Sequence, residues 1–379
     1  MPIKSLNYRL ADIISMVDVS EATARRMIEE LHIEPRRIPA GSSSRPVYSL
    51  DQVLSLSRHK RTRQQKTQFK RPLMISVYVP KGGVGKSTIT NELAADFSLL
   101  GLNVLAIDLD DQASLTVMMG YQPDEVPDGD KPNPWLVEHT FLQALYAPGP
   151  GGNPLSLKDI IRTPYGEHGP KLVPADITLG ELVYKLSNQA NREKFIRQWV
   201  VTQADKDLKE YDIILVDNAP STSVVSRASI VAADILIIPV RLDALTVKSI
   251  GFLANELNGL AEAGLDVPQV IAVPNFFRAN NNRSARVMSA LQRQFGEDVP
   301  IAPHIGESER FPKSLMFDVG RELEEVLPVA FENWNRSFER QHQEIRAVSS
   351  FVLGIASGML KRSEPGDLFD EPKKQATAK

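Results

Sequence analysis

The sequence predicts an α/β protein whose main part is a doubly wound, mostly parallel sheet, with a smaller α-helical domain before it. Two observations carry this prediction. From residue 73 onward, short apolar runs rich in β-branched residues alternate with amphipathic helical patterns, which is typical of parallel strands joined by crossover helices. Residues 8–31, in contrast, contain two short helical patterns and no strand-like run.

The first strand is expected at residues 74–79, MISVYV, and a helical pattern ending at Gly101 follows the loop PKGGVGKST of residues 80–88. Strand, glycine-rich loop and helix form the context that a phosphate-binding loop requires. Glycines allow backbone N–H groups to surround a phosphate chain, and the helix adds the positive end of its dipole. Lys86 is expected at the β- and γ-phosphates and the Ser87 hydroxyl on Mg²⁺. The candidate nucleotide-binding residues here are Lys81, Gly82, Gly83, Val84, Gly85, Lys86, Ser87 and Thr88.

Two residues narrow the class of this loop. In the common pattern GxxxxGK[ST] the first glycine would fall at Pro80, and a second lysine, Lys81, follows it here. The loop therefore resembles the deviant Walker A motif of the ParA/MinD family of ATPases. The resemblance implies that ATP is the nucleotide and that a homodimer closes face to face around two ATP molecules. It also implies that Lys81 reaches across to the nucleotide of the second subunit.

The second strand is expected at residues 103–110, NVLAIDLD, which end in carboxylates. Ligands of doubly wound sheets bind at this carboxyl edge. The run DLDDQAS resembles the DxDPQ segment of the same family, although Asp111 replaces the proline. The resemblance implies that Asp108 lies in the Mg²⁺–water shell and that Asp110 orients the attacking water. Lys81, Lys86 and Asp110 are thus the catalytic candidates, and plain solvation at a strand end is the alternative for both aspartates.

Further strands are expected at residues 211–221, 235–239 and 269–277, which brings the expected number of parallel strands to five. Asp217 ends the first of these runs in the manner of a Walker B aspartate, which holds Mg²⁺ through water. The predicted metal ligands are therefore Ser87, Asp108 and Asp217. By resemblance, Asn275 contacts the base.

Three other stretches have less specific predictions. Residues 121–169, rich in Pro, Gly and Asp, are expected to form an extended, partly mobile insertion with a short helix at 141–146. Residues 171–186 are expected to run from a strand through a turn into a helix, with Asp176 as a cap. Residues 322–357 are expected to form two helices. Four arginines occupy places where relatives grip non-specific DNA, with a solvated surface as the alternative: Arg278, Arg283, Arg286 and Arg310.

The N-terminal region has helix-turn-helix spacing, with helices expected at residues 10–16 and 21–31 and Ser20 as the N-cap of the second. The turn, Val17-Asp18, lacks the usual glycine. A basic, flexible loop at residues 36–45, then a short strand and another helix, would form a wing. The arrangement resembles the winged helix-turn-helix of MerR-like regulators and of the larger plasmid-type ParA proteins. The candidate DNA-binding residues are Ser20, Thr23, Arg25, Arg26, Arg36, Arg37 and Arg45; a helical domain that serves only dimer contacts is the alternative.

Charge is distributed unevenly along the chain. Residues 1–72 contain 14 basic and 7 acidic residues, a net charge of +7, so the remainder carries −10 of the total −3. A basic N-terminal region on an acidic body favours a nucleic-acid partner. Residues 58–71 hold seven basic residues and no acid, as a linker or as an extension of the last helix. The predicted divisions are a DNA-binding domain at 1–57, a linker at 58–72, an ATPase domain at 73–362 and a disordered tail at 363–379.

The composition excludes several classes of site and of protein. The absence of cysteine excludes disulfides, cysteine-type zinc fingers and cysteine-bound iron–sulfur clusters. No run approaches the roughly 18 apolar residues of a membrane helix. The first residues, MPIKSLNYRL, lack a signal-peptide core. We therefore expect a cytoplasmic, nucleoid-associated protein with no membrane partner.

Taken together, these features predict an ATP- and Mg²⁺-dependent ATPase that partitions plasmid DNA. The resemblance implies that the ATP-bound homodimer binds DNA non-specifically and that a ParB-like partner stimulates hydrolysis. The N-terminal domain would bind an operator and repress the partition genes. The alternative is a transcription repressor whose nucleotide site is only a sensor, and a third option is an ATPase that positions a protein cargo.

Overall fold

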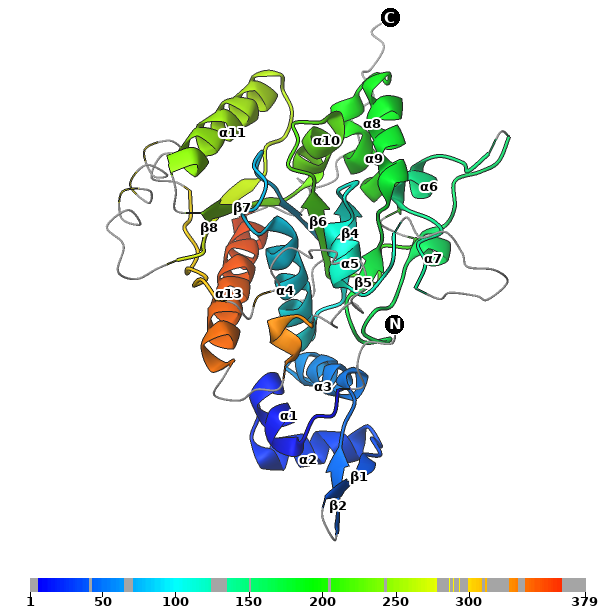
Figure 1. Ribbon diagram of the computed structural model, residues 1–379, viewed down its shortest axis with the longest axis vertical. Coiled ribbons are helices and arrows are strands. Elements are labelled where there is room, and N and C mark those ends of the chain that lie inside the picture. The colour runs from blue at the N-terminus through cyan, green and yellow to red at the C-terminus, as the bar shows by residue number, and fades with distance from the viewer. Residues whose placement is uncertain are drawn as a thin grey trace, which may run out of the picture.

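The computed structural model describes residues 6–40, 43–64, 71–123, 135–149, 151–203, 206–241, 244–277, 299–308, 327–332 and 338–362, and residues 286, 289, 293 and 311. Its centre is a six-stranded sheet in the order β5-β4-β6-β3-β7-β8, and every strand pair is parallel (Figure 1). The strands are β3 (Leu73–Val77), β4 (Val104–Leu109), β5 (Lys171–Val173), β6 (Ile213–Asn218), β7 (Ile235–Arg241) and β8 (Gln269–Asn275). The predicted doubly wound parallel sheet is confirmed. The sixth strand, β5, is the short strand expected at the start of residues 171–186, which the expected number of five parallel strands did not include.

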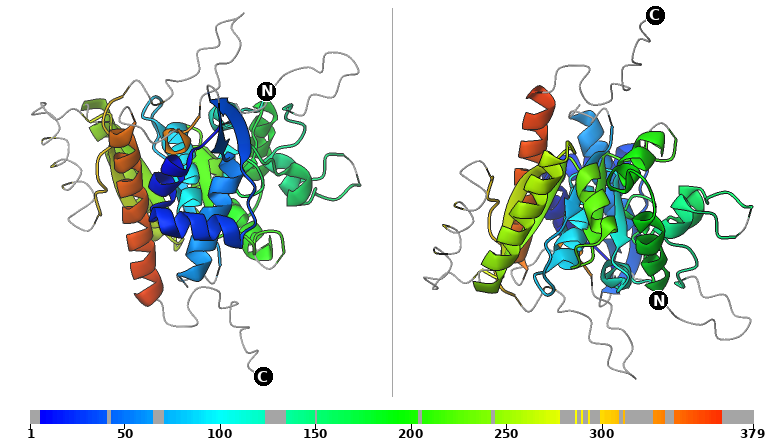
Figure 2. Two further views of the ribbon diagram at one scale, coloured as in Figure 1. Left: turned by 90° about the horizontal axis from the view of Figure 1, so that it is seen from below. Right: turned by 90° about the horizontal axis from the view of Figure 1, so that it is seen from above.

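Helices cover both faces of the sheet because alternate strand residues point to opposite sides. On one face, Ile75 and Val77 share a core with α4 (Lys86–Leu99), α5 (Ser114–Met118) and α13 (Glu339–Arg362). On the other face, Met74 and Ile214 pack with several helices, and α11 covers the β7–β8 end. These helices are α8 (Gly180–Ser187), α9 (Phe195–Gln203), α10 (Val224–Ala232) and α11 (Ala244–Glu262). Helix α13 lies beside α4 (Figure 1), and Figure 2 shows the sheet and its helices from below and from above.

The described parts of the insertion pack on the body instead of extending from it. Its helices α6 (Phe141–Leu145) and α7 (Leu157–Ile160) bury Phe141 and Leu157 in the core of the second face. The expected short helix is confirmed, whereas the expectation of an extended segment was wrong for these residues. Large apolar side chains between the prolines and glycines supply the buried contacts that the composition obscured.

The N-terminal head consists of α1 (Leu10–Val17), α2 (Glu21–Glu30), the antiparallel strands β1 (Arg36–Ala40) and β2 (Ser43–Val47), and α3 (Leu50–Arg63). Ser20 caps α2, because its Oγ accepts a hydrogen bond from the Thr23 backbone N–H. Asp18 takes the left-handed conformation (φ 55°) that a turn glycine would supply. The prediction of a flexible loop at residues 36–45 was wrong for its described residues, since the two basic stretches satisfy each other's backbone groups as paired strands.

The head is not a separate body on a tether. Tyr8, Leu54 and Leu56 are fully buried in the same core as Phe97 of α4. The Tyr8 hydroxyl also donates to the carbonyl of Phe331, in the short 3₁₀ helix η3 (Val329–Phe331). Helix α3 continues past residue 57 to Arg63, so residues 58–63 extend the helix, one of the two alternatives for the basic stretch. The domain boundary itself stays a prediction.

Two predictions fall partly outside the described residues. The first of the two helices expected at residues 322–357 lies there, apart from η3, and so does the tail at 363–379. The second helix is α13, which is confirmed and packs on α4. In the part of the chain that the structure describes, no helix has the length and apolar character to span a bilayer.

A close contact joins the head to the end of α4. Gly101 has a left-handed φ of +83°, and a Cβ there would lie 2.5 Å from the carbonyl oxygen of Ser57 and 2.8 Å from Cβ of Arg61. Gly264 has a similar φ of +71°, but nothing lies within 4 Å of the equivalent position. An alanine at Gly264 would suffer backbone strain alone, whereas an alanine at Gly101 would suffer the same strain and a steric clash with α3.

We predict that Gly101→Ala destabilises the fold more than Gly264→Ala does. The strain common to both costs about 1–2 kcal/mol, and the clash with α3 roughly doubles the loss at Gly101. Thermal unfolding followed by circular dichroism measures both variants. Equal losses would show that α3 does not press on Gly101.

Buried Glu92 connects α4 to η3. Its two carboxylate oxygens accept hydrogen bonds from the backbone N–H groups of Val329 (2.8 Å) and Ala330 (3.1 Å). Burial raises the pKa of Glu92 to about 8, against the lowering effect of the two N–H donors. The folded protein therefore retains a proton on Glu92 at pH values where the unfolded chain has released it.

We predict that the contribution of Glu92 to stability falls as the pH rises from about 4.5 to 8. Over that range Glu92 is more protonated in the folded state than in the unfolded state, so its contribution to the free energy of unfolding decreases by at most about 1.4 kcal/mol per pH unit. Urea denaturation between pH 5 and pH 9, at roughly unit steps, measures the slope. Glu92→Gln should flatten the slope, because the amide does not ionise. Its amide cannot accept both N–H bonds, so the variant is less stable than the parent at low pH, and the difference shrinks as the pH rises. An unchanged slope in the variant would refute the assignment.

Candidate functional site

The glycine-rich loop connects β3 to α4, as the motif requires. Gly83 and Gly85 have left-handed φ angles of +70° and +89°, which a side chain would strain. Lys86 is the first residue of α4 and is buried, and its Nζ donates a 2.9 Å hydrogen bond to the carbonyl oxygen of Lys81. Burial lowers the pKa of Lys86, and Asp217 and Asp110 oppose that effect. The loop thus places a positive charge in a cradle of backbone groups.

Three buried carboxylates lie at the carboxyl edge of the sheet, and two of them, Asp217 and Asp110, act on the charge of this lysine. Asp108 and Asp217 are the penultimate residues of the neighbouring strands β4 and β6 and are register partners, and Asp110 follows β4 directly. Burial raises the pKa of Asp217 to about 7, and burial together with Asp217 raises the pKa of Asp108 well above its usual range. The pKa of Asp110 is also raised by burial. These raised values mean that the site favours an added positive charge.

Asp217 has the features expected of a residue that holds Mg²⁺ through water. Its Oδ1 accepts a hydrogen bond from Thr90 Oγ1 (3.3 Å), whereas its Oδ2 is buried with no hydrogen-bond partner. Ser87 also hydrogen-bonds to this carboxylate. Among the described residues no three acidic or histidine side chains converge as a ready metal cage. The donors therefore fit Mg²⁺, which keeps several waters and uses phosphate oxygens as ligands.

Asp108 is already engaged within the protein. Its Oδ2 accepts from the backbone N–H (2.9 Å) and the hydroxyl (2.8 Å) of Thr116, and its Oδ1 accepts from the Asp110 N–H (3.1 Å). These bonds fix the turn that carries Asp110. The part that the resemblance gives Asp108 in the Mg²⁺ shell stays a prediction, as does the water-orienting part of Asp110. Asp110 is 6% exposed, and its Oδ1 accepts from the Gln112 N–H.

Asn275 lies against the phosphate loop. Its Nδ2 donates to the carbonyl oxygen of Val84 (2.9 Å), and its Oδ1 accepts from the Phe276 N–H. A Cβ on Gly85 would lie 2.5 Å from the Nδ2 atom. Phe276 has a strained φ of 55°, and the Arg241 guanidinium lies 5.1 Å from its ring. Asn275 therefore supports the loop, and its predicted base contact stays a prediction.

The structure adds three site residues that the sequence did not single out. Thr90 and Thr116 hold the carboxylates of Asp217 and Asp108, as described above. The Asn218 Nδ2 donates to Ser76 Oγ and to the Val77 carbonyl, which ties β6 to β3 beside the loop. Thr90 lies two residues after the phosphate loop, Thr116 eight residues after Asp108, and Asn218 directly after Asp217. No sequence motif used above includes these three positions.

The DNA-binding candidates are gathered on the outer surface of the head. Ser20 serves as a helix cap, and Arg25 and Arg26 are exposed on α2, paired with Glu21 and Glu30. The hairpin presents Arg36, Arg37 and Arg45, all exposed. Of the four arginines proposed for non-specific DNA, Arg286 is described and exposed, whereas Arg278, Arg283 and Arg310 lie outside the described residues.

Comparison with known proteins places this site in a family. Residues 73–266 match the family AAA_31, described as an AAA domain. The cell division protein PomZ of Myxococcus xanthus is 25% identical over 277 residues, which is 73% of this chain and 78% of PomZ. The chromosome partitioning protein ParA of the same organism is 25% identical over 65% of this chain and 82% of its own length.

Solved structures share the fold. A structure described as "Partition Protein" is similar with a TM-score of 0.62 over 95% of this chain and 94% of that chain, at 15% identity. Cobyrinic acid a,c-diamide synthase from Mycobacterium smegmatis, solved with an ATP analogue and magnesium, covers 63% of this chain and 88% of its own, with a TM-score of 0.52 and 22% identity. The first similarity includes the head, and the second is confined to a smaller part of the chain.

We predict that Asn275→Ala weakens the binding of ATP and GTP by the same factor, about tenfold, because the side chain acts through the Val84 carbonyl. Titration calorimetry with each nucleotide measures the effect. Asn188→Ala is the matched control, since the exposed Asn188 side chain donates to the Tyr184 carbonyl of α8. A selective loss of ATP affinity would instead favour a base contact.

Proposed function

Because the chain belongs to the AAA_31 family of ParA/MinD-like P-loop ATPases, we propose that it is an ATP- and Mg²⁺-dependent ATPase that partitions DNA. One observation carries the proposal: a buried lysine and three buried carboxylates with raised pKa values meet at a glycine loop, in a chain that also bears a basic head. The relatives PomZ and ParA, named for cell division and chromosome partitioning, support the same class of function.

The chemistry follows from the positions of the side chains. Lys86 holds the β- and γ-phosphate oxygens, and the loop N–H groups surround the phosphate chain. Ser87 and Asp217, through water, hold Mg²⁺, which when bound neutralises charge on the phosphate oxygens. Asp110 orients the water that attacks the γ-phosphate. Lys81 of a second subunit adds positive charge to the nucleotide, so hydrolysis depends on the homodimer.

In this proposal DNA is bound in two ways. The ATP-bound homodimer binds nucleoid DNA without sequence preference, and a ParB-like partner stimulates hydrolysis and release. The head acts as a winged helix-turn-helix, with α2 in the major groove and the β1–β2 hairpin as the wing, and represses its own operator. The exposed arginines of both elements support this role. A repressor that only senses nucleotide is the second candidate, favoured by the size of the head and its shared core with the body.

Anisotropy with labelled random-sequence DNA distinguishes the candidates. The full chain is measured at one salt concentration with ATP, with ADP and without nucleotide, beside an Arg36→Ala/Arg37→Ala/Arg45→Ala variant. Substitution is preferable to removal of the head, because removal would expose the core that α3 shares with α4. Binding that requires ATP and survives in the variant supports partition. Binding that ignores nucleotide and is lost in the variant supports the repressor.

We predict opposite outcomes for two variants of the site. Lys86→Ala loses nucleotide binding, because its charge on the phosphates is removed. Asp110→Ala binds ATP but hydrolyses it at least about 100-fold more slowly, so it accumulates as a dimer. Light scattering with ATP measures the mass, and Glu181→Ala, at an exposed acidic residue of α8, is the control. A monomeric Asp110→Ala protein in ATP would contradict the role given to Asp110.

A further inference from the structure

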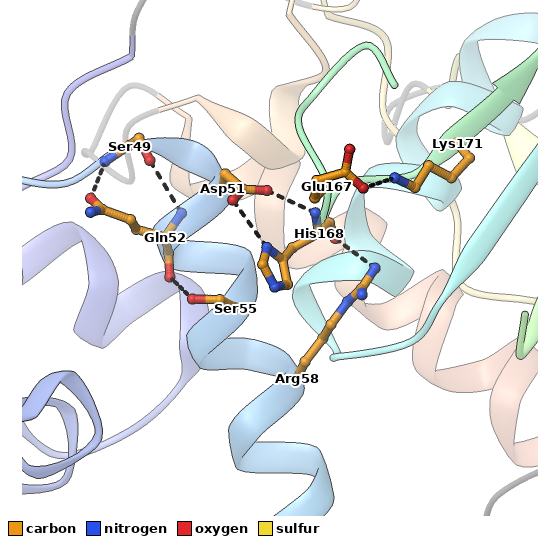
Figure 3. Close-up of polar contacts among 8 residues, drawn as sticks. All are labelled: Ser49, Asp51, Gln52, Ser55, Arg58, Glu167, His168 and Lys171. Carbon is orange, nitrogen blue, oxygen red and sulfur yellow. Dashed lines mark hydrogen bonds and ion pairs between the residues drawn. The ribbon is translucent and has the colours of Figure 1, made fainter. Parts of the chain in front are cut away.

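A polar contact joins α3 of the head to the turn before β5 (Figure 3). Asp51 accepts two hydrogen bonds from His168, at 2.7 Å from its backbone N–H and at 3.0 Å from its Nδ1. The Arg58 guanidinium donates to the His168 carbonyl oxygen at 3.1 Å. Asp51 and Arg58 are two helical turns apart and so lie on one face of α3. One residue of the body is thus held at three points by one helix of the head.

The turn before β5 contains a glycine where Asp51 of α3 comes close to its backbone. Gly166 has a left-handed φ of +89°, and a Cβ there would lie 2.7 Å from Asp51 Oδ1. Any side chain at this position would both strain the turn and push Asp51 away. The neighbouring ion pair between Glu167 and Lys171 (2.8 Å), in contrast, stays within the body.

The strand that follows this turn reaches the candidate ATP site. Residues 171–173 pair with β4, in register with the run that ends in Asp108. Just beyond β5, the Ala175 N–H donates to Thr116 Oγ1 (2.9 Å), whose hydroxyl donates to Asp108 Oδ2 (2.8 Å). A single short segment therefore contacts the head at His168 and, through Thr116, is linked at Ala175 to buried Asp108.

The contact at His168 can open while α3 keeps its apolar packing on α4. The Asp51 and His168 side chains are 38% and 37% exposed, so water can replace their hydrogen bonds at little cost. The apolar side of α3 is different, since Leu54 and Leu56 are fully buried and Ser57 presses on Gly101. Helix α3 is therefore anchored firmly on α4 and held loosely at His168.

We propose that the contact of Asp51 and Arg58 with His168 is a latch through which nucleotide occupancy sets the position of the head. The structure shows the latch closed. Nucleotide and Mg²⁺ at the phosphate loop change the hydrogen bonds that Asp108 accepts, β5 moves with Thr116 and Ala175, and α3 pivots on α4. This inference rests on the proposed function, because it requires nucleotide at that site, and it adds the route by which the head responds.

The test uses a pair of spin labels on the full chain, which has no cysteine of its own. Glu29→Cys on α2 and Glu181→Cys on α8 are exposed sites that take no part in the latch. Pulsed electron–electron double resonance measures the distance between the two labels without nucleotide, with Mg²⁺ and ADP, and with Mg²⁺ and AMPPNP. We expect AMPPNP to shift the distance by a few ångströms in the parent protein.

In Asp51→Ala, we expect the nucleotide-free distance to be displaced or broadened already and AMPPNP to add no further shift. Arg58→Met, which keeps the aliphatic stem, is a second variant that removes a different bond of the latch. Glu167→Ala is the matched control and should respond like the parent. Calorimetry of AMPPNP binding to each protein is done alongside, and Asp51→Ala should bind within about twofold of the parent.

Two results would overturn the latch: an unchanged distance in the parent although AMPPNP binds, or a full shift in both latch variants. A parent that binds no AMPPNP would defeat the proposed function itself, and the calorimetry recognises that case separately.

Discussion

Helix α4 is buried over eleven consecutive residues, Ile89 to Leu99, and the rest of the structure depends on covering it. A helix that is buried all round cannot rest on a sheet alone. The sheet covers one side, α13 and η3 cover others, and α3 of the head packs near its C-terminal end. The phosphate loop lies at the opposite end of the same helix (Figure 1). The ATP site and the head thus share one structural support.

Buried polar residues on α4 determine which elements pack against this helix. Glu92 accepts two backbone N–H bonds from η3, and Asp96 accepts both contacts of the Arg346 guanidinium from α13, at 2.8 and 3.1 Å. Buried groups of this kind destabilise a structure unless they are satisfied, so they admit one arrangement of neighbours and exclude others. The C-terminal helix is thereby placed against the helix of the phosphate loop although 250 residues separate Asp96 from Arg346.

At the other end of α4 the same low-dielectric surroundings raise the pKa values of Asp108, Asp110 and Asp217 and lower that of Lys86. Bound Mg²⁺ would supply the positive charge that these carboxylates favour, and the phosphates would neutralise Lys86. Hydrogen bonds link Asp108 to Thr116, and Thr116 to Ala175, so the network of the site extends beyond the phosphate loop. In the latch proposed above, these hydrogen bonds are the route by which the ATP site would act on the head.

The sequence by itself determined the parallel sheet, the phosphate loop and the carboxylates at strand ends, because strand period, glycine spacing and motif order are local properties. It also identified Ser20 as a helix cap, since capping involves residues three apart. Tertiary structure alone decided that residues 36–40 and 43–47 are strands, that Asn275 supports the Val84 carbonyl, and that His168 meets Asp51. Some of these pairings join residues that are far apart in the sequence. The two strands, in contrast, are rich in charged and polar residues and lack the alternation of apolar residues that predicts a strand. Their partners are chosen by which buried polar groups find each other when the chain packs, and no local pattern contains that information.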